Sequence, residues 1–123
     1  MKDKCIEEHK MCCCDKKTVA IVRGTTPAFR FTFKEDISAA SVILLTFVQK
    51  KSIVKEYDKD DLEIDGDTLT LYMSQEDTFL FDEEDAAVAQ VRALYPDGVA
   101  VGCEPYAMPV VPVLNNTVLE EGE

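Results

Sequence analysis

The clearest strand signal in this chain is Leu62-Glu63-Ile64-Asp65-Gly66-Asp67-Thr68-Leu69-Thr70-Leu71-Tyr72. On both sides of its centre, apolar and polar residues alternate, which is the pattern of β-strands with one buried face. At its centre lies Gly66, which can adopt the positive φ that a tight hairpin turn requires. The stretch therefore predicts an antiparallel β-hairpin.

The same period of two extends toward the N-terminus. Phe29, Phe31 and Phe33 alternate with polar residues, which places three aromatic rings on one face of a strand. Residues 41–49 are rich in Val, Ile, Leu and Phe on both faces. This pattern predicts a central strand that is covered on both sides.

Toward the C-terminus, residues 87–94 alternate again, and Pro96-Asp97-Gly98 provides a turn into residues 99–103. We therefore predict a strand within residues 82–94. The alternative there is a helix, because the segment is rich in Ala and begins with four acidic residues, and the fold class would then be α+β.

A single helical turn is expected after the first hairpin, where Ser74 can cap a turn that carries Asp77 at its third position. With about seven to nine short strands and one such turn, the chain is predicted to be an all-β antiparallel sandwich. The C-terminal stretch that contains Pro105, Pro109 and Pro112 is predicted to be an edge strand or an extended arm. Proline lacks the backbone N–H that pairing inside a sheet requires.

The length of 123 residues, with 46% hydrophobic and 30% charged residues, indicates one globular domain. We expect it to span residues 18–114, with a Cys-rich tail at residues 1–17 and an acidic tail at residues 115–123.

The formal net charge of −11 disfavours nucleic acid as a partner, because phosphate backbones repel an acidic surface. No membrane association is expected either, because the longest apolar run, residues 42–48, is far shorter than the roughly 20 residues of a spanning helix.

No residue is assigned a catalytic, cofactor-binding or metal-binding role, and no enzyme activity is expected. The thiols and the only imidazole near the N-terminus are ligand types that zinc prefers, but their spacing does not match a zinc module. They are Cys5, His9, Cys12, Cys13 and Cys14. Cys103 is predicted to be a small core residue. The acidic residues of the 58–67 region are interpreted as a solvated face, with a weak divalent-cation site as the alternative.

Three segments carry a resemblance to a known family: Val22-Arg23-Gly24-Thr25-Thr26-Pro27, residues 72–78, and residues 91–94 with Asp97-Gly98. Over residues 18–114 the chain resembles small structural proteins encoded by phages and prophages of Gram-positive bacteria. More loosely, it resembles the immunoglobulin-like N-terminal domain of phage upper-baseplate proteins. The Cys-rich tail departs from that pattern.

The resemblance implies an immunoglobulin-like β-sandwich that serves as a non-catalytic tail or baseplate component. It implies other virion or tail-assembly proteins as partners, with homo-oligomers as a further expectation. It also implies that the protein resides in the bacterial cytoplasm during assembly and afterwards in the virion.

Two other functions remain open at this stage. One is a small metal- or thiol-linked regulatory protein that uses residues 1–17, and the other is a ligand-binding sandwich. The apolar residues Met108, Val110, Val111, Val113 and Leu114 could form a docking strip. We favour the alternative that they close the edge of the sandwich itself.

Overall fold

The predicted hairpin is present in the computed structural model, which describes residues 20–121. Strand β5 (Glu63–Asp65) pairs antiparallel with β6 (Thr68–Tyr72), and Gly66 between them has a φ of +62°. On its other side β6 pairs with β2 (Ala28–Thr32), in a register that sets Phe29 opposite Leu71 and Phe31 opposite Leu69. These apolar pairs form the inner face of a three-stranded sheet.

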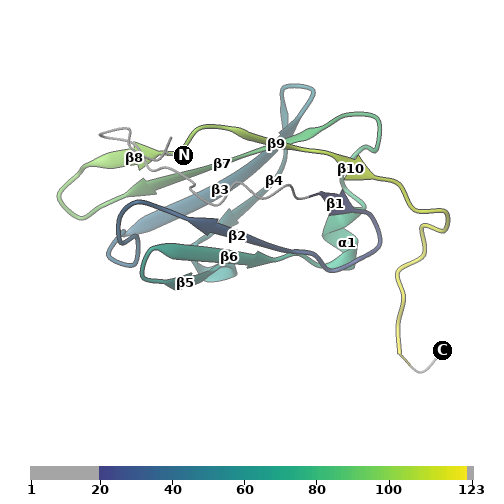
Figure 1. Cartoon of the computed structure of the whole chain (residues 1–123), viewed down its shortest axis with the longest axis horizontal. Coiled ribbons are helices and arrows are strands. Elements are labelled where there is room, and N and C mark those ends of the chain that lie inside the picture. Colours follow the sequence, from purple (N-terminus) through teal and green to yellow (C-terminus); the bar gives the residue numbers. More distant parts are fainter. Residues whose placement is uncertain (1–19, 122–123) are drawn as a thin grey trace.

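A second antiparallel sheet packs across this inner face (Figure 1). Its strand order is β4 (Ser52–Asp58), β3 (Val42–Gln49), β7 (Ala87–Leu94) and β8 (Ala100–Gly102), and β9 (Tyr106–Met108) also pairs with β7. The chain crosses between the two sheets from β2 to β3, from β4 to β5 and from β6 to β7. In addition, β1 (Ile21–Val22) runs parallel to β10 (Val110–Val111). This arrangement is an immunoglobulin-like sandwich, which confirms the all-β prediction.

Aromatic rings join the two sheets. Phe47 of β3 is fully buried, and its ring centroid lies 6.2 Å from that of Phe29, 5.9 Å from that of Tyr57 and 5.5 Å from that of Phe81. The last two contacts are edge-on, which is the arrangement that the charge distribution of aromatic rings favours. The centre of the core is therefore a cluster of rings contributed by both sheets.

The short helices lie where the sequence indicates capping. Helix α1 (Gln75–Thr78) begins after Ser74, whose Oγ accepts a hydrogen bond from the Asp77 backbone N–H at 3.1 Å. A 3-10 turn (Lys59–Asp61) follows Asp58, which caps it. In the part of the chain that the structure describes, no helix is long and apolar enough to cross a membrane.

Residues 82–94 form a strand only from Ala87 onward, so the strand prediction is confirmed for 87–94 and the helix alternative is wrong. Residues 82–86 instead form turns. The terminal apolar strip divides in two: Met108 and Val110 are buried and close the edge of the sandwich, whereas Leu114 is fully exposed. The edge-closing prediction therefore holds for the first half of the strip only.

The buried Tyr57 hydroxyl donates a hydrogen bond to Asp77 Oδ2 at 2.9 Å. Burial, followed by this hydrogen bond and the Asp77 charge, raises the pKa of Tyr57 far above its ordinary value of 10.0. In the unfolded chain the Tyr57 hydroxyl ionises at that ordinary value, whereas in the folded protein it stays protonated. The contribution of this group to the free energy of unfolding is therefore fully present below pH 10. It falls above pH 10, by at most about 1.4 kcal/mol per pH unit.

Tyr57→Phe is accordingly expected to flatten the loss of stability above pH 10, as measured by urea unfolding at a series of pH values. Tyr72→Phe should retain most of the loss, because the hydrogen bond to Glu63 raises the pKa of this exposed hydroxyl without the burial that acts on Tyr57. Equal slopes for Tyr57→Phe and the wild type would contradict the assignment.

Candidate binding surface

The outer face of the β4-β3-β7-β8 sheet carries several exposed apolar side chains. The register sets Val42 opposite Leu94 and Val48 opposite both Val88 and Ile53. Val42, Leu94 and Ile53 are 48%, 40% and 60% exposed. Central strand β3 was predicted to be covered on both faces, and this is wrong for the outer face, because no second layer of described residues packs there.

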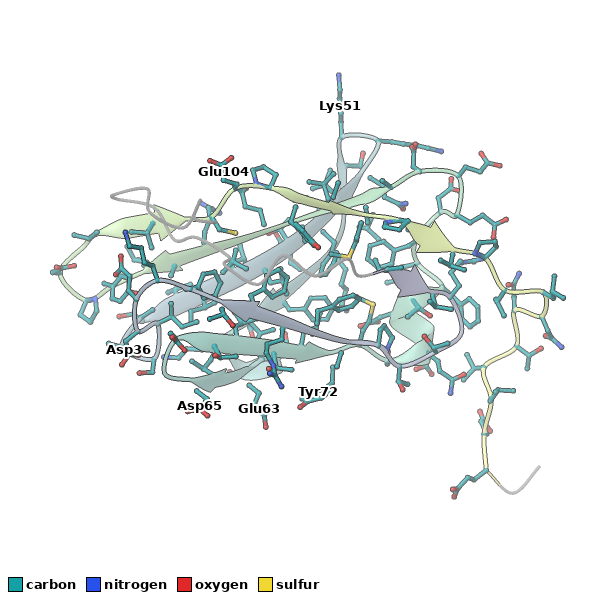
Figure 2. The ribbon with its side chains drawn as sticks, viewed as in Figure 1. Asp36, Lys51, Glu63, Asp65, Tyr72 and Glu104 are labelled. Carbon is teal, nitrogen blue, oxygen red and sulfur yellow. The ribbon has the colours of Figure 1, made fainter. Side chains whose placement is uncertain are left out.

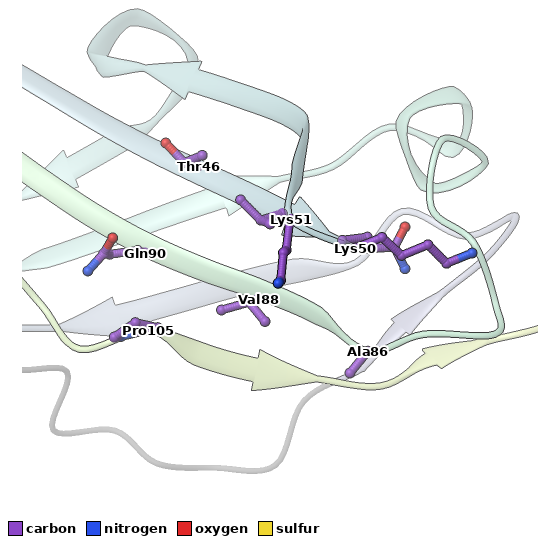
Figure 3. Close-up of a pocket in the computed structure, with 9 residues that line it drawn as sticks. Thr46, Lys50, Lys51, Ala86, Val88, Gln90 and Pro105 are labelled. Carbon is purple, nitrogen blue, oxygen red and sulfur yellow. The ribbon is translucent and has the colours of Figure 1, made fainter.

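The first of two hollows on this face lies where β3 turns into β4 (Figure 3). It has a volume of about 320 Å³. Apolar side chains from β3, β7 and the segment before β9 line it together with polar and basic groups of the turn. The lining residues are Thr46, Val48, Gln49, Lys50, Lys51, Ala86, Val88, Gln90 and Pro105.

The second hollow lies at the other end of the same face, beside the β7–β8 hairpin. It has a volume of about 430 Å³ and is lined by Val42, Leu44, Arg92, Ala93, Leu94, Ala100, Val101 and Gly102. The paired residues Thr46 and Gln90 line the side of the first hollow that is nearer to Leu44 of the second, so a polar pair follows Leu44 along β3. Along β3, the residues of this face are therefore apolar, then polar, then apolar again and finally basic.

The basic end of the face is the β3–β4 turn. Lys50 and Lys51 have φ values of 52° and 66°, the left-handed conformation of a two-residue hairpin turn. Lys50 Nζ lies 2.9 Å from Asp82 Oδ2, and this contact raises the pKa of Lys50 and, with the Glu84 backbone N–H, lowers that of Asp82. Lys51 is exposed and forms no ion pair with any residue in the 20–121 range. It is therefore available to a partner, and so is Arg92 of the second hollow, which is likewise exposed and without an ion pair among these residues.

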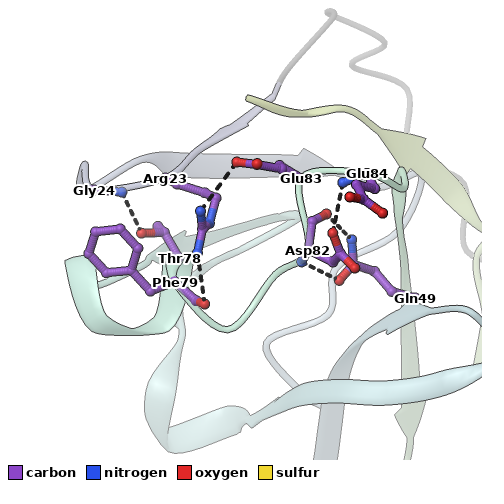
Figure 4. A network of polar contacts seen from close by, with 8 residues as sticks. All are labelled: Arg23, Gly24, Gln49, Thr78, Phe79, Asp82, Glu83 and Glu84. Carbon is purple, nitrogen blue, oxygen red and sulfur yellow. Dashed lines mark hydrogen bonds and ion pairs between the residues drawn. The ribbon is translucent and has the colours of Figure 1, made fainter. Parts of the chain in front are cut away.

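Gln49 fixes the loop that borders the first hollow (Figure 4). Its side-chain N–H groups donate to the backbone oxygens of Asp82 at 2.7 Å and Asp85 at 2.9 Å, and its Oε1 accepts from Asp82 N at 2.8 Å. The residue is 6% exposed, so these bonds form largely out of water. The amide thereby holds the 82–86 turns against the end of β3.

Arg23 holds the neighbouring part of that loop (Figure 4). Its guanidinium lies 3.3 Å from Glu83 Oε1 and 5.2 Å from the centroid of the Phe79 ring. The Thr78 hydroxyl accepts a hydrogen bond from the Gly24 N–H at 2.9 Å and so joins the same corner to α1.

The remaining residues singled out from the sequence do not assemble into a site. Cys103 is buried, as predicted, and its Sγ accepts a hydrogen bond from Val91 N at 3.4 Å. The six acidic residues of the 58–67 region are all exposed, and residues 20–121 contain no group of three or more His, Cys, Asp or Glu placed to hold a metal ion. Cys5, His9, Cys12, Cys13 and Cys14 lie outside the described residues.

No protein-family model matches the sequence, and no curated protein matches it either. Among solved structures, extracellular domains 3–5 of Drosophila OTK align with this chain at 13% identity and a TM-score of 0.38. The alignment covers 85% of this chain and 36% of that one, so this chain spans well under half of its length.

Proposed function

We propose that this protein is a non-catalytic module that acts through protein–protein contacts, and that the outer face of the β4-β3-β7-β8 sheet is its contact surface. The proposal is supported by the exposed apolar side chains of Val42 and Leu94, which line one of the two hollows on this face, and of Ile53, which pairs with Val48 of the other. Exposed apolar surface is costly to leave in water, and apolar hollows with polar and basic surroundings are typical of interaction sites.

In this proposal the partners are other proteins of a phage or prophage tail or baseplate, together with further copies of the chain. This biological setting rests on the sequence resemblance over residues 18–114. The acidic net charge of −11 supports protein rather than nucleic acid as the partner. The regulatory alternative, which uses residues 1–17, makes the opposite prediction on truncation, because deletion of those residues would abolish its function and leave that of a contact module intact.

The proposal predicts that Leu94→Glu weakens incorporation into phage particles at least tenfold, because a charge enters the apolar contact surface. Incorporation is measured by inducing the prophage in cells that carry the tagged protein and fractionating the particles on a density gradient. Tyr72→Glu is the matched control, because Tyr72 is 66% exposed on β6 of the opposite sheet.

The control should enter particles at the wild-type level. Absence of the wild-type protein from particles, with a gene that lies among metabolic genes, would refute the proposed setting. Equal incorporation of both variants would refute the assigned face.

A further inference from the structure

We infer that the two hollows bind the C-terminal arm, residues 114–121, of a second copy of this chain, so that copies join head to tail. This inference rests on the proposed function and adds the identity of one partner. It follows from the exposure of the arm, the order of residue types along the arm and the face, their spacing and their charge.

The arm leaves the sandwich after β10 and runs beyond its end (Figure 1). Leu114 is fully exposed and Leu119 is 72% exposed, although both are large apolar residues. Figure 2 shows the side chains of this segment standing away from the two sheets. Such residues gain the most from burial when a partner surface covers them.

The arm is also held in place at its far end. Gln75 of α1 binds the backbone of Leu119 twice: its Oε1 accepts from Leu119 N at 2.8 Å, and its Nε2 donates to Leu119 O at 3.1 Å. The leucine side chain remains exposed while its backbone is fixed. This fixation reduces the entropy that the arm loses on binding and keeps it away from the hollows of its own chain.

Residue types follow the same order along the arm and along the face. The arm reads Leu114, Asn115-Asn116-Thr117, Val118-Leu119 and Glu120-Glu121, which is apolar, polar, apolar and acidic. Along β3, the face carries Val42 and Leu44 of the second hollow, then Thr46 and Val48 of the first hollow, and then the β3–β4 turn with Lys50 and Lys51, which is apolar, polar, apolar and basic. An arm laid along β3 would therefore set its two apolar segments against apolar residues, its polar segment beside Thr46 and its acidic end against the β3–β4 turn, whereas Arg92 of the second hollow lies outside this order.

The spacing agrees with this pairing. Leu114 and Leu119 are five residues apart, so an extended chain separates them by at most about 17 Å. On β3, Val48 of the first hollow lies four residues from Leu44 and six from Val42 of the second, which corresponds to about 13 to 20 Å. One leucine can therefore occupy each hollow.

Charge supports the contact between the arm and the face. Two copies with a net charge of −11 repel each other, so a stable contact needs a local attraction. With Leu119 in the first hollow, Glu120 and Glu121 reach the turn that carries Lys51, an exposed cation without an ion pair among residues 20–121. Such a contact pairs two different surfaces, so each copy keeps one free arm and one free face, and assembly continues into chains or rings.

The test uses two variants of the full chain under reducing conditions at low salt, with the mass of the particles measured by sedimentation velocity over a range of concentrations. The face variant is Lys51→Glu with Val88→Glu, and the arm variant is Leu114→Glu with Leu119→Glu. The wild type should form species larger than dimers, and each variant alone should associate at least tenfold more weakly. Lys34→Glu, an exposed charge change elsewhere, should behave as the wild type.

An equimolar mixture of the two variants tests directly whether the arm of one copy binds the face of another, because the intact arm of the face variant can bind the intact face of the arm variant. We expect a complex of two chains that does not grow further. A wild type that stays monomeric at several hundred micromolar, variants that associate as the wild type does, or a mixture without a dimer would each overturn the inference. If the wild type were monomeric but its incorporation into particles still depended on the outer face, the inference would fail and the proposed function would stand. Failure of the inference can therefore be distinguished from failure of the proposed function.

Discussion

Replacing Phe47 with alanine is expected to lower the free energy of unfolding by about 4 kcal/mol, within the range for loss of a fully buried phenylalanine. Phe47 has no exposed surface, and its ring contacts rings from β2, β4 and the segment after α1. Truncation leaves a cavity at the point where both sheets meet, and rigid aromatic neighbours cannot easily fill it. A loss of this size is a large part of the stability of a domain of this length.

Urea unfolding followed by circular dichroism measures this effect. Tyr72→Ala is the matched control, because it truncates an aromatic side chain that is 66% exposed, and it should cost less than about 1 kcal/mol. If Phe47→Ala cost no more than Tyr72→Ala, the ring cluster would not be the centre of the core.

Gln49→Met is expected to lower the free energy of unfolding by about 3 kcal/mol, because methionine keeps the length of the side chain and removes its amide. Two backbone oxygens, those of Asp82 and Asp85, and the Asp82 N–H would lose their partner. The site is 6% exposed, so water cannot replace these bonds without opening the loop.

Gln90→Met is the matched control on the neighbouring strand. Gln90 donates a single hydrogen bond, at 2.8 Å to the Cys103 backbone oxygen, so its loss should cost about 1 kcal/mol. Hydrogen exchange should in addition show faster exchange at the Asp82 amide in Gln49→Met. Unchanged protection there, with equal stability of the two variants, would show that the amide does not hold the loop.

Both predictions concern contacts that sequence patterns do not reveal. The strand at residues 87–94 could be identified because its alternation is local, and the hairpin around Gly66 because a single glycine supplies the turn. By contrast, Gln49 and its partners are separated by 33 to 36 residues, and Gln75 and Leu119 by 44. A glutamine at the end of a strand gives no local sign of such a partner.

The candidate binding surface likewise could be predicted only in part from the sequence. Residues 41–49 are apolar on both faces, and the pattern was interpreted as two covered faces. Periodicity reports that a face is apolar and does not report whether another layer packs on it. The outer hollows arise from the register that brings Val42 beside Leu94 and Val48 beside Val88, together with the absence of a covering layer among residues 20–121.

The sequence alone therefore determined the all-β class, both hairpins, the capped turn at Ser74 and the inward face of most strands. These features depend on φ preferences, capping groups and a period of two, all of which act within a few residues. The tertiary structure alone decided which strands are neighbours, which apolar face stays uncovered, and where Gln49, Gln75 and Lys51 lie relative to it. These depend on pairings between distant segments, whose free energy is set by the packing of the whole domain and not by any single stretch of chain.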